Sequence, residues 1–501
     1  MVQIHDYPLW METEKPRYST LDGAHSCDVA VVGGGLTGIT TALLLARAGV
    51  KTAVLEAEEV GTGTSGRTTA KVTVQHDVRL HGLGESKARA YLEANRAGLD
   101  LIAALVDEYH IDCDFKRCPA YVYARNDSEE EAIEKELNMY EQIGLSARLT
   151  HDVSLPFPVR CALVVEDQAF FHPLKYLYAL ARQLDSMGVP VYEHSRVVDA
   201  ERDTDVVKVR TEHGTLHAKA VVLATGYPLV EYPGLFFLRL HQERSYLMAV
   251  RKSIDTGGMG ITAGDPVNSV RTHRMDGSDW LIVGGFGHKT GQEDKKDDTG
   301  YGPLDEYLRR FGELNAEYQW SAQDCVTLDN IPYVGSLYWE GPNVYVATGY
   351  DKWGMTNSAG AAQMLCDMIT GSDVIDKEVR SVFDPLRAAP AASAKNFVVQ
   401  TADTLRAFTV GRAGIEDGDF DDIRPGEGAV RRINGNARAI YKDESGHIRM
   451  YSAACTHLKC PVEYNAAERT FDCQCHGSRF SLTGDVIDGP AQLPLEPKMD
   501  E

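Results

Sequence analysis

The sequence predicts a mixed α/β protein in which a Rossmann-like domain is interleaved with a β-rich domain and followed by a small all-β domain. Three observations predict this architecture. A strand, a glycine-rich turn, a helix and a second strand succeed one another between residues 28 and 56. Strand-like runs dominate from 190 to 290, and four cysteines gather between residues 455 and 475 behind a linker-like segment. A length of 501 residues suits about three domains, or two if one is large.

Composition excludes several classes of partner. The chain carries 51 Lys and Arg against 73 Asp and Glu, and its formal net charge of −22 would repel nucleic acid and anionic lipid. Hydrophobic residues make up 43% and charged residues 25%, as in ordinary globular proteins. The N-terminus lacks a basic and apolar leader, and no apolar run approaches the roughly 18 residues of a membrane span. We therefore expect a cytoplasmic protein without an integral membrane segment.

The first βαβ unit follows a polar arm. Residues 28–32 are a β-branched run of the kind buried in parallel sheets. Residues 39–46 have the pattern of a helix, and residues 51–55 form the second strand.

The turn of this unit has the spacing Gly33-x-Gly35-x-x-Gly38. Such glycines allow a tight turn, an unobstructed approach for a pyrophosphate, and close packing of helix on strand. Glu56 ends the second strand, where a carboxylate accepts hydrogen bonds from ribose hydroxyls. A second candidate fingerprint at residues 284–291 has the wrong glycine spacing. The residues therefore predict one bound dinucleotide, either FAD or NAD.

The middle of the chain alternates helical and strand-like patterns. An amphipathic helix is expected from about residue 85, and Ser128 with Glu131 is expected to form the capping box of the next helix. The expected strands lie at 206–209, 220–223, 246–250 and 280–283.

These patterns, together with a family resemblance over residues 25–372, give the expected domain boundaries. An arm covers 1–27, an oxidoreductase part 28–372, a linker 373–424 and the small domain 425–501. Within the oxidoreductase part, the dinucleotide-binding segments are expected at about 28–80, 195–230 and 325–372, and the substrate segments at about 81–194 and 231–324. A final domain this small has a marginal apolar core, so a metal centre or crosslink is expected to support it.

Residues 25–372 resemble the glycine oxidase, sarcosine oxidase and D-amino-acid oxidase group of FAD enzymes. The resemblance rests on the fingerprint with Glu56 and on residues 63–70, 221–226 and 348–356. It implies that FAD is the cofactor and that the substrate is a small amine or amino-acid-like molecule. The residues that it places at the flavin are Gly33, Gly35, Leu36, Thr37, Gly38, Glu56, Thr64, Ser65, Arg67, Thr68, Thr69, Ala70, Val198, Ala224, Thr225, Gly226, Gly349, Gly354, Met355 and Thr356.

One position departs from the family. Sarcosine oxidase-like members hold the substrate carboxylate with a lysine where this sequence has Thr356, and Lys352 is the nearby residue that would compensate. Oxidation of a C–H bond next to nitrogen remains what the resemblance implies. Cys325 is interpreted either as a buried structural cysteine or as a covalent attachment point for the flavin, as in some relatives.

The motifs define no acid–base residue. The family fold brings five residues near the substrate face, so these are the catalytic candidates, although each is also explained by packing: His172, Gln168, Tyr246, Lys352 and Trp353.

Two mixed Cys/His pairs stand near the C-terminus. Cys455-x-His457 and Cys473-x-x-His476 suit a [2Fe–2S] centre with both thiolates on one iron and both imidazoles on the other. Structural zinc is the alternative, although zinc fingers usually pair Cys with Cys and His with His.

With Asn465 and residues 477–480 and 489–491, this pattern resembles the Rieske domains of respiratory and photosynthetic cytochrome complexes. The resemblance implies a disulfide between Cys460 and Cys475.

Two further residues bear on the reduction potential of the cluster. By the same resemblance, Ser478 donates a hydrogen bond to a cluster sulfur. Phe480 stands where high-potential members carry a tyrosine, so one donor is missing. We expect a potential below theirs, within the range of about −150 to +300 mV.

An oxygenase would also need a mononuclear iron held by two His and a carboxylate. His76 and His81 have a suggestive spacing, but Thr73 stands where an Asp would belong. We interpret this spacing as coincidence.

The chain as a whole resembles fused flavoprotein–Rieske oxidoreductases. A flavin accepts a hydride and a Rieske cluster accepts single electrons, so the pair would pass electrons from a small amine to an external one-electron carrier or a quinone. Two alternatives remain open: the cluster feeds a flavin that performs a reduction, or it is a structural or redox-sensing module on a simple oxidase. The sequence does not indicate the oligomeric state.

Overall fold

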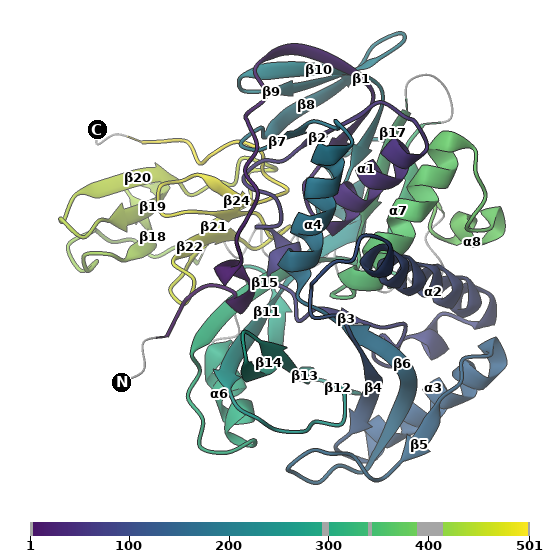
Figure 1. The fold of residues 1–501 in the computed structure, drawn as a ribbon. Coiled ribbons are helices and arrows are strands. Elements are labelled where there is room, and N and C mark those ends of the chain that lie inside the picture. The colour runs from purple at the N-terminus through teal and green to yellow at the C-terminus, as the bar shows by residue number, and fades with distance from the viewer. Residues whose placement is uncertain (1–3, 293–299, 339–342, 388–413, 499–501) are drawn as a thin grey trace.

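The computed structural model describes residues 4–292, 300–338, 343–387 and 414–498. It confirms the predicted architecture: a Rossmann-like domain, a β-rich domain interleaved with it and a small all-β domain at the C-terminal end (Figure 1). The described part of the chain contains no helix with the length and apolarity of a membrane span.

A largely parallel sheet forms the centre of the Rossmann-like domain. Strand β1 pairs in parallel with β10 on one side and β2 on the other, which brings the first βαβ unit next to a strand far along the sequence. The sheet order is β16 (Tyr333–Ser336), β17 (Asn343–Thr348), β10 (Gly214–Leu223), β1 (Gly23–Val32), β2 (Thr52–Leu55) and β7 (Val191–Tyr192), with β9 (Val207–Thr211) pairing with β10 and β8 (Val197–Arg202) pairing with β9.

Helices cover this sheet and pack on one another (Figure 1). They bury apolar faces because their hydrophobic residues recur at helical spacing. The group consists of α1 (Leu36–Arg47), α2 (Glu85–Glu108), α4 (Pro173–Ser186), α7 (Gly354–Thr370) and α8 (Lys377–Val382).

A second, mostly antiparallel sheet forms the β-rich domain. Its order is β15 (Tyr318–Thr327), β11 (Leu240–Arg251), β14 (Ser278–Lys289), β13 (Asn268–Met275), β12 (Met259–Thr262), β4 (Lys116–Ala124), β6 (Cys161–Phe170) and β3 (Lys71–Val72), with β5 (Arg148–Thr150) on β6. Helices α3 (Asp127–Ile143), α5 (Phe236–Arg239) and α6 (Tyr301–Arg309) belong to the same part of the chain. Strands β9, β10, β11 and β14 overlap the four predicted strand runs.

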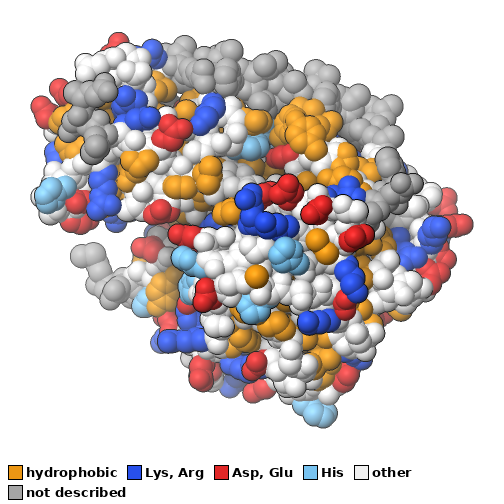
Figure 2. All heavy atoms as spheres, turned by 90° about the horizontal axis from the view of Figure 1, so that it is seen from above, with side chains coloured by type: hydrophobic (Ala, Val, Ile, Leu, Met, Phe, Trp, Pro, Cys, Tyr) orange, Lys and Arg blue, Asp and Glu red, His pale blue; other side chains and the backbone are white. Residues whose placement is uncertain are grey.

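The C-terminal domain consists of two small antiparallel sheets that lie beside the larger domains (Figure 1). The first contains β18 (Gly428–Ile433), β19 (Asn436–Lys442) and β20 (Ile448–Ser452). The second contains β21 (Val462–Asn465), β22 (Thr470–Cys473), β23 (Arg479–Phe480) and β24 (Val486–Asp488). On the face shown in Figure 2, basic and acidic side chains are interspersed, so the net charge is not concentrated there.

The N-terminal segment is more ordered than a polar arm. Strand β1 begins at Gly23, ahead of the expected residue 28. A 3-10 turn, η1 (Leu9–Glu12), buries Leu9 and Trp10 completely, and the Trp10 indole N–H donates to the Thr68 carbonyl oxygen at 2.8 Å. Single apolar residues have no periodicity, which is why the sequence did not indicate their packing.

The predicted capping box is wrong. Helix α3 begins at Asp127, and the Asn126 side chain is its cap because it accepts a hydrogen bond from the Glu129 amide at 3.0 Å. Ser128 is already inside the helix and donates to the Asn126 side chain at 2.7 Å. Asn is as good an N-cap as Ser, and here it comes first in the chain.

The expected linker contains structure at both ends. Helix α8 lies within it, whereas residues 388–392 lie outside the described residues. Near its end, Ile423 is buried with Ala429 and Ile440, and the Arg432 amide donates to the Glu416 carbonyl oxygen. The fold of the C-terminal domain therefore includes residues ahead of 425.

Candidate active site and metal centre

A cavity of about 1240 Å³ opens between the two large sheets and the C-terminal domain. Its wall contains sixteen of the twenty residues that the sequence assigned to the flavin: Gly33, Gly35, Leu36, Thr37, Glu56, Thr64, Ser65, Arg67, Thr68, Thr69, Ala224, Thr225, Gly226, Gly349, Gly354 and Met355. These residues come from four distant stretches, which the parallel sheet and its connections bring to one place.

The glycine turn forms a cradle that a larger residue would fill. A Cβ on Gly33 would overlap the Ala224 carbonyl oxygen, and one on Gly38 would overlap the Gly33 carbonyl oxygen. A Cβ on Gly35 would lie 2.9 Å from Ser65 Oγ. Helix α1 begins at this turn, so its N-terminal amides and its positive dipole end suit a pyrophosphate.

Glu56 is held rigidly at the cavity. Its carboxylate accepts hydrogen bonds from the Gly34 amide at 2.6 Å and the Glu58 amide at 2.9 Å. Burial raises the pKa of Glu56 above its ordinary value, although the hydrogen bonds from these amides act to lower it. Together with the glycine cradle, this fixed carboxylate fits the ribose and pyrophosphate of FAD.

Four predicted flavin residues do not form the wall. Gly38 packs α1 against the turn, and Ala70 occupies a buried turn position with φ of 55°. On β8, Val197 lines the cavity, whereas Val198 is exposed because consecutive strand side chains point to opposite faces. The fourth residue is Thr356, on α7.

Thr356 points away from the cavity into the helix layer. It is fully buried, and its hydroxyl contacts the Thr73 carbonyl oxygen at 3.0 Å and Asn95 Oδ1 at 2.7 Å. The hydroxyl therefore joins α7 to α2 and cannot face a substrate, which corrects its assignment.

Two of the catalytic candidates are also structural. His172 caps α4 by accepting a hydrogen bond from the Lys175 amide, and burial lowers its pKa to about 3. Gln168 accepts from the Val74 amide at 2.8 Å. Neither belongs to the cavity wall, so the alternative interpretation, a packing or hydrogen-bonding role, accounts for both residues.

The other three candidates, Tyr246, Lys352 and Trp353, line the cavity. The Tyr246 hydroxyl contacts His288 Nε2 at 2.9 Å. Lys352 Nζ forms an ion pair with Glu243 at 2.7 Å. Burial would lower the pKa of Lys352, but Glu243 outweighs it and the pKa is raised. Lys352 is thus a cation whose charge is already compensated.

Sequence reasoning missed three charged residues near this site. Lys71, in the cavity wall, donates to Thr69 Oγ1 at 3.0 Å; burial, together with the positive charge of Arg271, lowers the pKa of Lys71 to about 7. Arg271 itself is completely buried and donates to the Thr69 carbonyl oxygen. Asp324, also in the wall, has its pKa raised to about 7 by burial. The only available signal was that Lys71 follows the flavin-type stretch 63–70.

The four predicted iron ligands lie together in the C-terminal domain. Cys455 and Cys473 are buried free thiols in hydrogen-bond contact, which lowers the pKa of Cys455 and raises that of Cys473. The His457 and His476 rings lie 5.1 Å apart between centroids. Among the described residues, the buried Nδ1 of His476 has no hydrogen-bond partner. Two thiols and an unsatisfied imidazole nitrogen fit a Rieske cluster.

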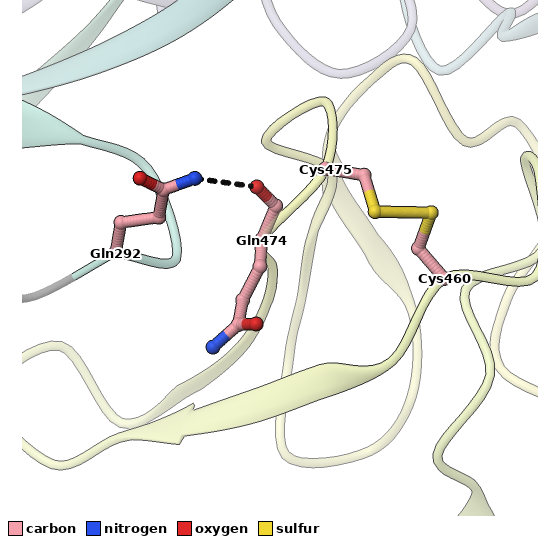
Figure 3. The surroundings of a disulfide bond; sticks show 4 residues. All are labelled: Gln292, Cys460, Gln474 and Cys475. Carbon is pink, nitrogen blue, oxygen red and sulfur yellow. Dashed lines mark hydrogen bonds between the residues drawn. A yellow bond between two sulfur atoms is a disulfide. The ribbon is translucent and has the colours of Figure 1, made fainter. Parts of the chain in front are cut away.

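The predicted disulfide is confirmed between Cys460 and Cys475 (Figure 3). Their sulfurs lie within 4.8 Å of Cys473 Sγ. Because the disulfide consumes both thiols, neither is available to bind metal, and Cys455 with Cys473 remain as the thiolate pair. On the other side of the loop, the Gln292 side chain donates to the Gln474 carbonyl oxygen at 3.3 Å, which ties the loop to the β-rich domain (Figure 3).

Ser478 contacts one of the two thiols, that of Cys455. It is fully buried, hydrogen-bonds the Cys455 sulfur and accepts from the Ala491 amide at 3.0 Å. Phe480 is also fully buried and belongs to the apolar core of this domain.

Phe480→Tyr should raise the reduction potential of the cluster by about 40 mV. One added hydrogen bond contributes about 1 kcal/mol. A tenfold change in a one-electron equilibrium corresponds to about 59 mV and to about 1.4 kcal/mol, so about 1 kcal/mol corresponds to about 40 mV. A redox titration followed by circular dichroism measures the shift. Phe471→Tyr, at another fully buried phenylalanine of this core, is the control. Equal potentials in the two variants would contradict the prediction.

Polar contacts seat the C-terminal domain against the cavity. The Gln323 side chain donates to the Gly477 carbonyl oxygen at 2.9 Å, and the Gln242 side chain donates to the His476 carbonyl oxygen at 3.3 Å. Glu468 forms an ion pair with Arg244 at 2.6 Å. Burial acts against ionisation of Glu468, but Arg244 outweighs it and the pKa is lowered. Residues 486–492 of the same domain complete the cavity wall.

The His76 and His81 pair is structural, as interpreted. His76 is buried and contacts the Tyr91 hydroxyl at 2.7 Å, while His81 forms an ion pair with Glu136 at 2.8 Å. Both rings are therefore committed to other side chains.

The fold and the two sites together define an FAD-dependent oxidoreductase that carries a Rieske [2Fe–2S] centre. The chain belongs to the FAD dependent oxidoreductase family, which residues 28–368 match. Residues 415–497 match the Rieske [2Fe-2S] domain. These matches confirm the resemblances at both ends of the chain and both cofactors.

The similar proteins match either nearly the whole length of this chain or its larger part. A Bacillus subtilis (strain 168) protein named "Putative Rieske 2Fe-2S iron-sulfur protein YhfW" is 36% identical over 97% of this chain and 96% of its own. Gamma-glutamylputrescine oxidoreductase of Escherichia coli (strain K12) is 28% identical over 71% of this chain and 86% of its own. The structure of glycine oxidase from Geobacillus kaustophilus shares the fold, with a TM-score of 0.62 and 19% identity over 73% of this chain and 100% of that one.

Proposed function

We propose that the protein oxidises a C–N bond of a small amine that carries an anionic group, and delivers the electrons singly to an external one-electron carrier or quinone. FAD supplies hydride acceptance when bound, and the Rieske cluster supplies one-electron transfer. The names of two relatives, glycine oxidase and gamma-glutamylputrescine oxidoreductase, support an amine substrate. Six free cysteines in the first 366 residues support a reducing, cytoplasmic compartment.

In this proposal the cavity wall holds FAD, and Cys455, His457, Cys473 and His476 hold the cluster. The other domain boundaries are proposed as the sequence indicates them, whereas the C-terminal domain is proposed to begin ahead of residue 425.

One contact carries the proposal. Gln323 lines the cavity and donates directly to Gly477, the neighbour of the proposed ligand His476. One side chain thus spans the space between the cavity and the ligand loop. A module that served only as a structural appendage would not require its ligand loop to lie against this wall.

Two buried cations support an anionic group on the substrate. Lys71 faces the cavity, and Arg271 next to it is fully buried. Burying two cations side by side is costly unless a negative charge accompanies them. Lys352 is already paired with Glu243, so Lys71 rather than Lys352 is proposed to take the place of the lysine that the family carries at Thr356.

Anaerobic mixing with candidate amines tests the proposed direction of electron flow. Bleaching of the flavin followed by reduction of the cluster supports it. A flavin that is reduced while the cluster stays oxidised would instead support a structural or sensing module, and no bleaching by any amine would favour the reductase alternative.

Lys71→Met should lower kcat/KM for amines that carry a carboxylate by about 100-fold, because a charged hydrogen bond contributes about 1.5–3 kcal/mol. Lys71 binds an anion only when protonated, and its pKa is about 7. The ratio of wild-type to K71M kcat/KM should therefore be largest below pH 7 and shrink above it. Steady-state kinetics over a pH series measure this ratio.

The exposed Lys135, which pairs with Glu131 at 3.9 Å, provides the control variant Lys135→Met. If K71M and K135M kept the same kcat/KM for every carboxylate-bearing amine, Lys71 would have no part in substrate binding.

A further inference from the structure

A carboxylate of the oxidoreductase part of the chain contacts a proposed cluster ligand across the interface with the C-terminal domain. Glu231 Oε1 lies 3.1 Å from His457 Nε2. Both side chains are largely buried, with 19% of Glu231 and 12% of His457 exposed. Glu231 follows β10 and the cavity-lining stretch 224–229, so it belongs to the opposite side of the interface from the ligand loops.

Glu231 is fixed in this position by its own domain. The Tyr227 hydroxyl donates to Glu231 Oε1 at 3.1 Å, and the Phe237 amide donates to Oε2 at 3.1 Å. Tyr227 is buried and lines the cavity. A continuous set of contacts therefore leads from the cavity wall through Tyr227 and Glu231 to His457.

We propose that Glu231 is a positioning residue that orients His457 and lowers the reduction potential of the cluster. The inference rests on the proposed function only in taking His457 as a ligand. Because Nε2 donates to Glu231, Nδ1 is the nitrogen left for iron. A carboxylate partner raises the basicity of a ligating imidazole and fixes its orientation.

Two effects have the same sign. A more basic ligand stabilises the oxidised cluster, and a nearby negative charge disfavours the arrival of an electron. Both lower the potential, which favours release of the electron to the external carrier. Because Glu231 belongs to the other domain, the potential also depends on how the C-terminal domain is seated.

The test is the midpoint potential of the full-length holoprotein with Glu231→Gln, measured at one pH by titration with dithionite and mediators. Gln keeps the shape and one acceptor oxygen but removes the charge. The midpoint should rise by the equivalent of a tenfold change in the one-electron equilibrium, about 59 mV. Tyr227→Phe, which removes one donor to the carboxylate, should change the g values of the reduced cluster much less than Glu231→Gln does.

Glu496→Gln is the matched control, because Glu496 is a carboxylate of the same domain as the cluster with 54% of its side chain exposed. A midpoint in E231Q equal to that of E496Q, or lower than wild type, overturns the role of Glu231.

Should E231Q fail to assemble the cluster, Glu231→Asp provides the same measurement, with a rise in the midpoint expected because the shorter side chain lengthens the contact. The titration needs no amine, so its outcome is independent of the substrate. Separately, a His457→Ala protein with wild-type g values would refute the ligand assignment itself.

Discussion

Cys473→Ser should produce a protein that amines still reduce at the flavin but that no longer passes electrons to an external one-electron carrier. Cys473 is one of only two free thiols that the structure describes in the C-terminal domain, and the disulfide has consumed the other two cysteines there. Replacement of residues outside the ligand shell already lowers metal affinity by roughly 10–100-fold, so loss of a ligand should cost more. The cluster should therefore be absent from the purified protein.

Three measurements on this variant separate the two halves of the reaction. Iron and sulfide analysis reports the cluster, anaerobic flavin bleaching reports hydride transfer, and steady-state reduction of a one-electron acceptor reports the complete route. Cys366→Ser on α7 is the control, since Cys366 is also a buried free thiol but belongs to the helix layer. If C473S lacked the cluster yet reduced the acceptor at the wild-type rate, the cluster would not be on the electron route.

Local motifs carried most of what the sequence could predict. The glycine turn, Glu56 and the two Cys/His pairs each lie within a short stretch, so their spacing reports their geometry directly. These features depend on neighbours in the chain, and the fold confirms the architecture that they implied. The disulfide between Cys460 and Cys475, in contrast, was predicted from the resemblance to Rieske domains.

The errors arose where distant segments meet. Lys71 reaches the cavity because β3 pairs with β6, about one hundred residues further on. The contact of Gln323 with Gly477 joins two domains, and no periodicity in the sequence relates them. The assignment of Val198 to the flavin was wrong by a single position. A strand has only two faces, so a shift of one residue along it exchanges the side chains that face the cavity for those that face away.

Two of the five catalytic candidates, His172 and Gln168, lie outside the cavity wall for a different reason. His172 is a residue type that often performs acid–base chemistry, but its ring nitrogens are used by the Lys175 amide and by Thr13. Buried polar side chains generally satisfy their hydrogen bonds within the fold. Residue type therefore cannot distinguish a catalytic group from a structural one until its partners are known.

Gly38→Ala should weaken FAD binding strongly. The added Cβ would overlap the Gly33 carbonyl oxygen, which is backbone and cannot rotate away. Overpacking of this kind costs about 1–3 kcal/mol, and relief requires α1 to move away from the turn that carries the pyrophosphate donors. We expect the dissociation constant for FAD to rise by about 100-fold, which corresponds to about 2.7 kcal/mol. Fluorescence titration of the flavin-free protein with FAD measures this change.

Gly82→Ala is the matched control, because a Cβ there meets no atom within 4 Å among the described residues. It makes the same substitution outside the cavity, so it reports any general effect of replacing glycine. Full flavin occupancy in G38A would mean that α1 tolerates displacement, and that close packing of helix on strand is not what fixes the phosphate donors. Loss of flavin in G38A with cluster content unchanged would instead show that the two cofactor sites assemble independently, despite the contacts that Gln323 and Gln242 make across their interface.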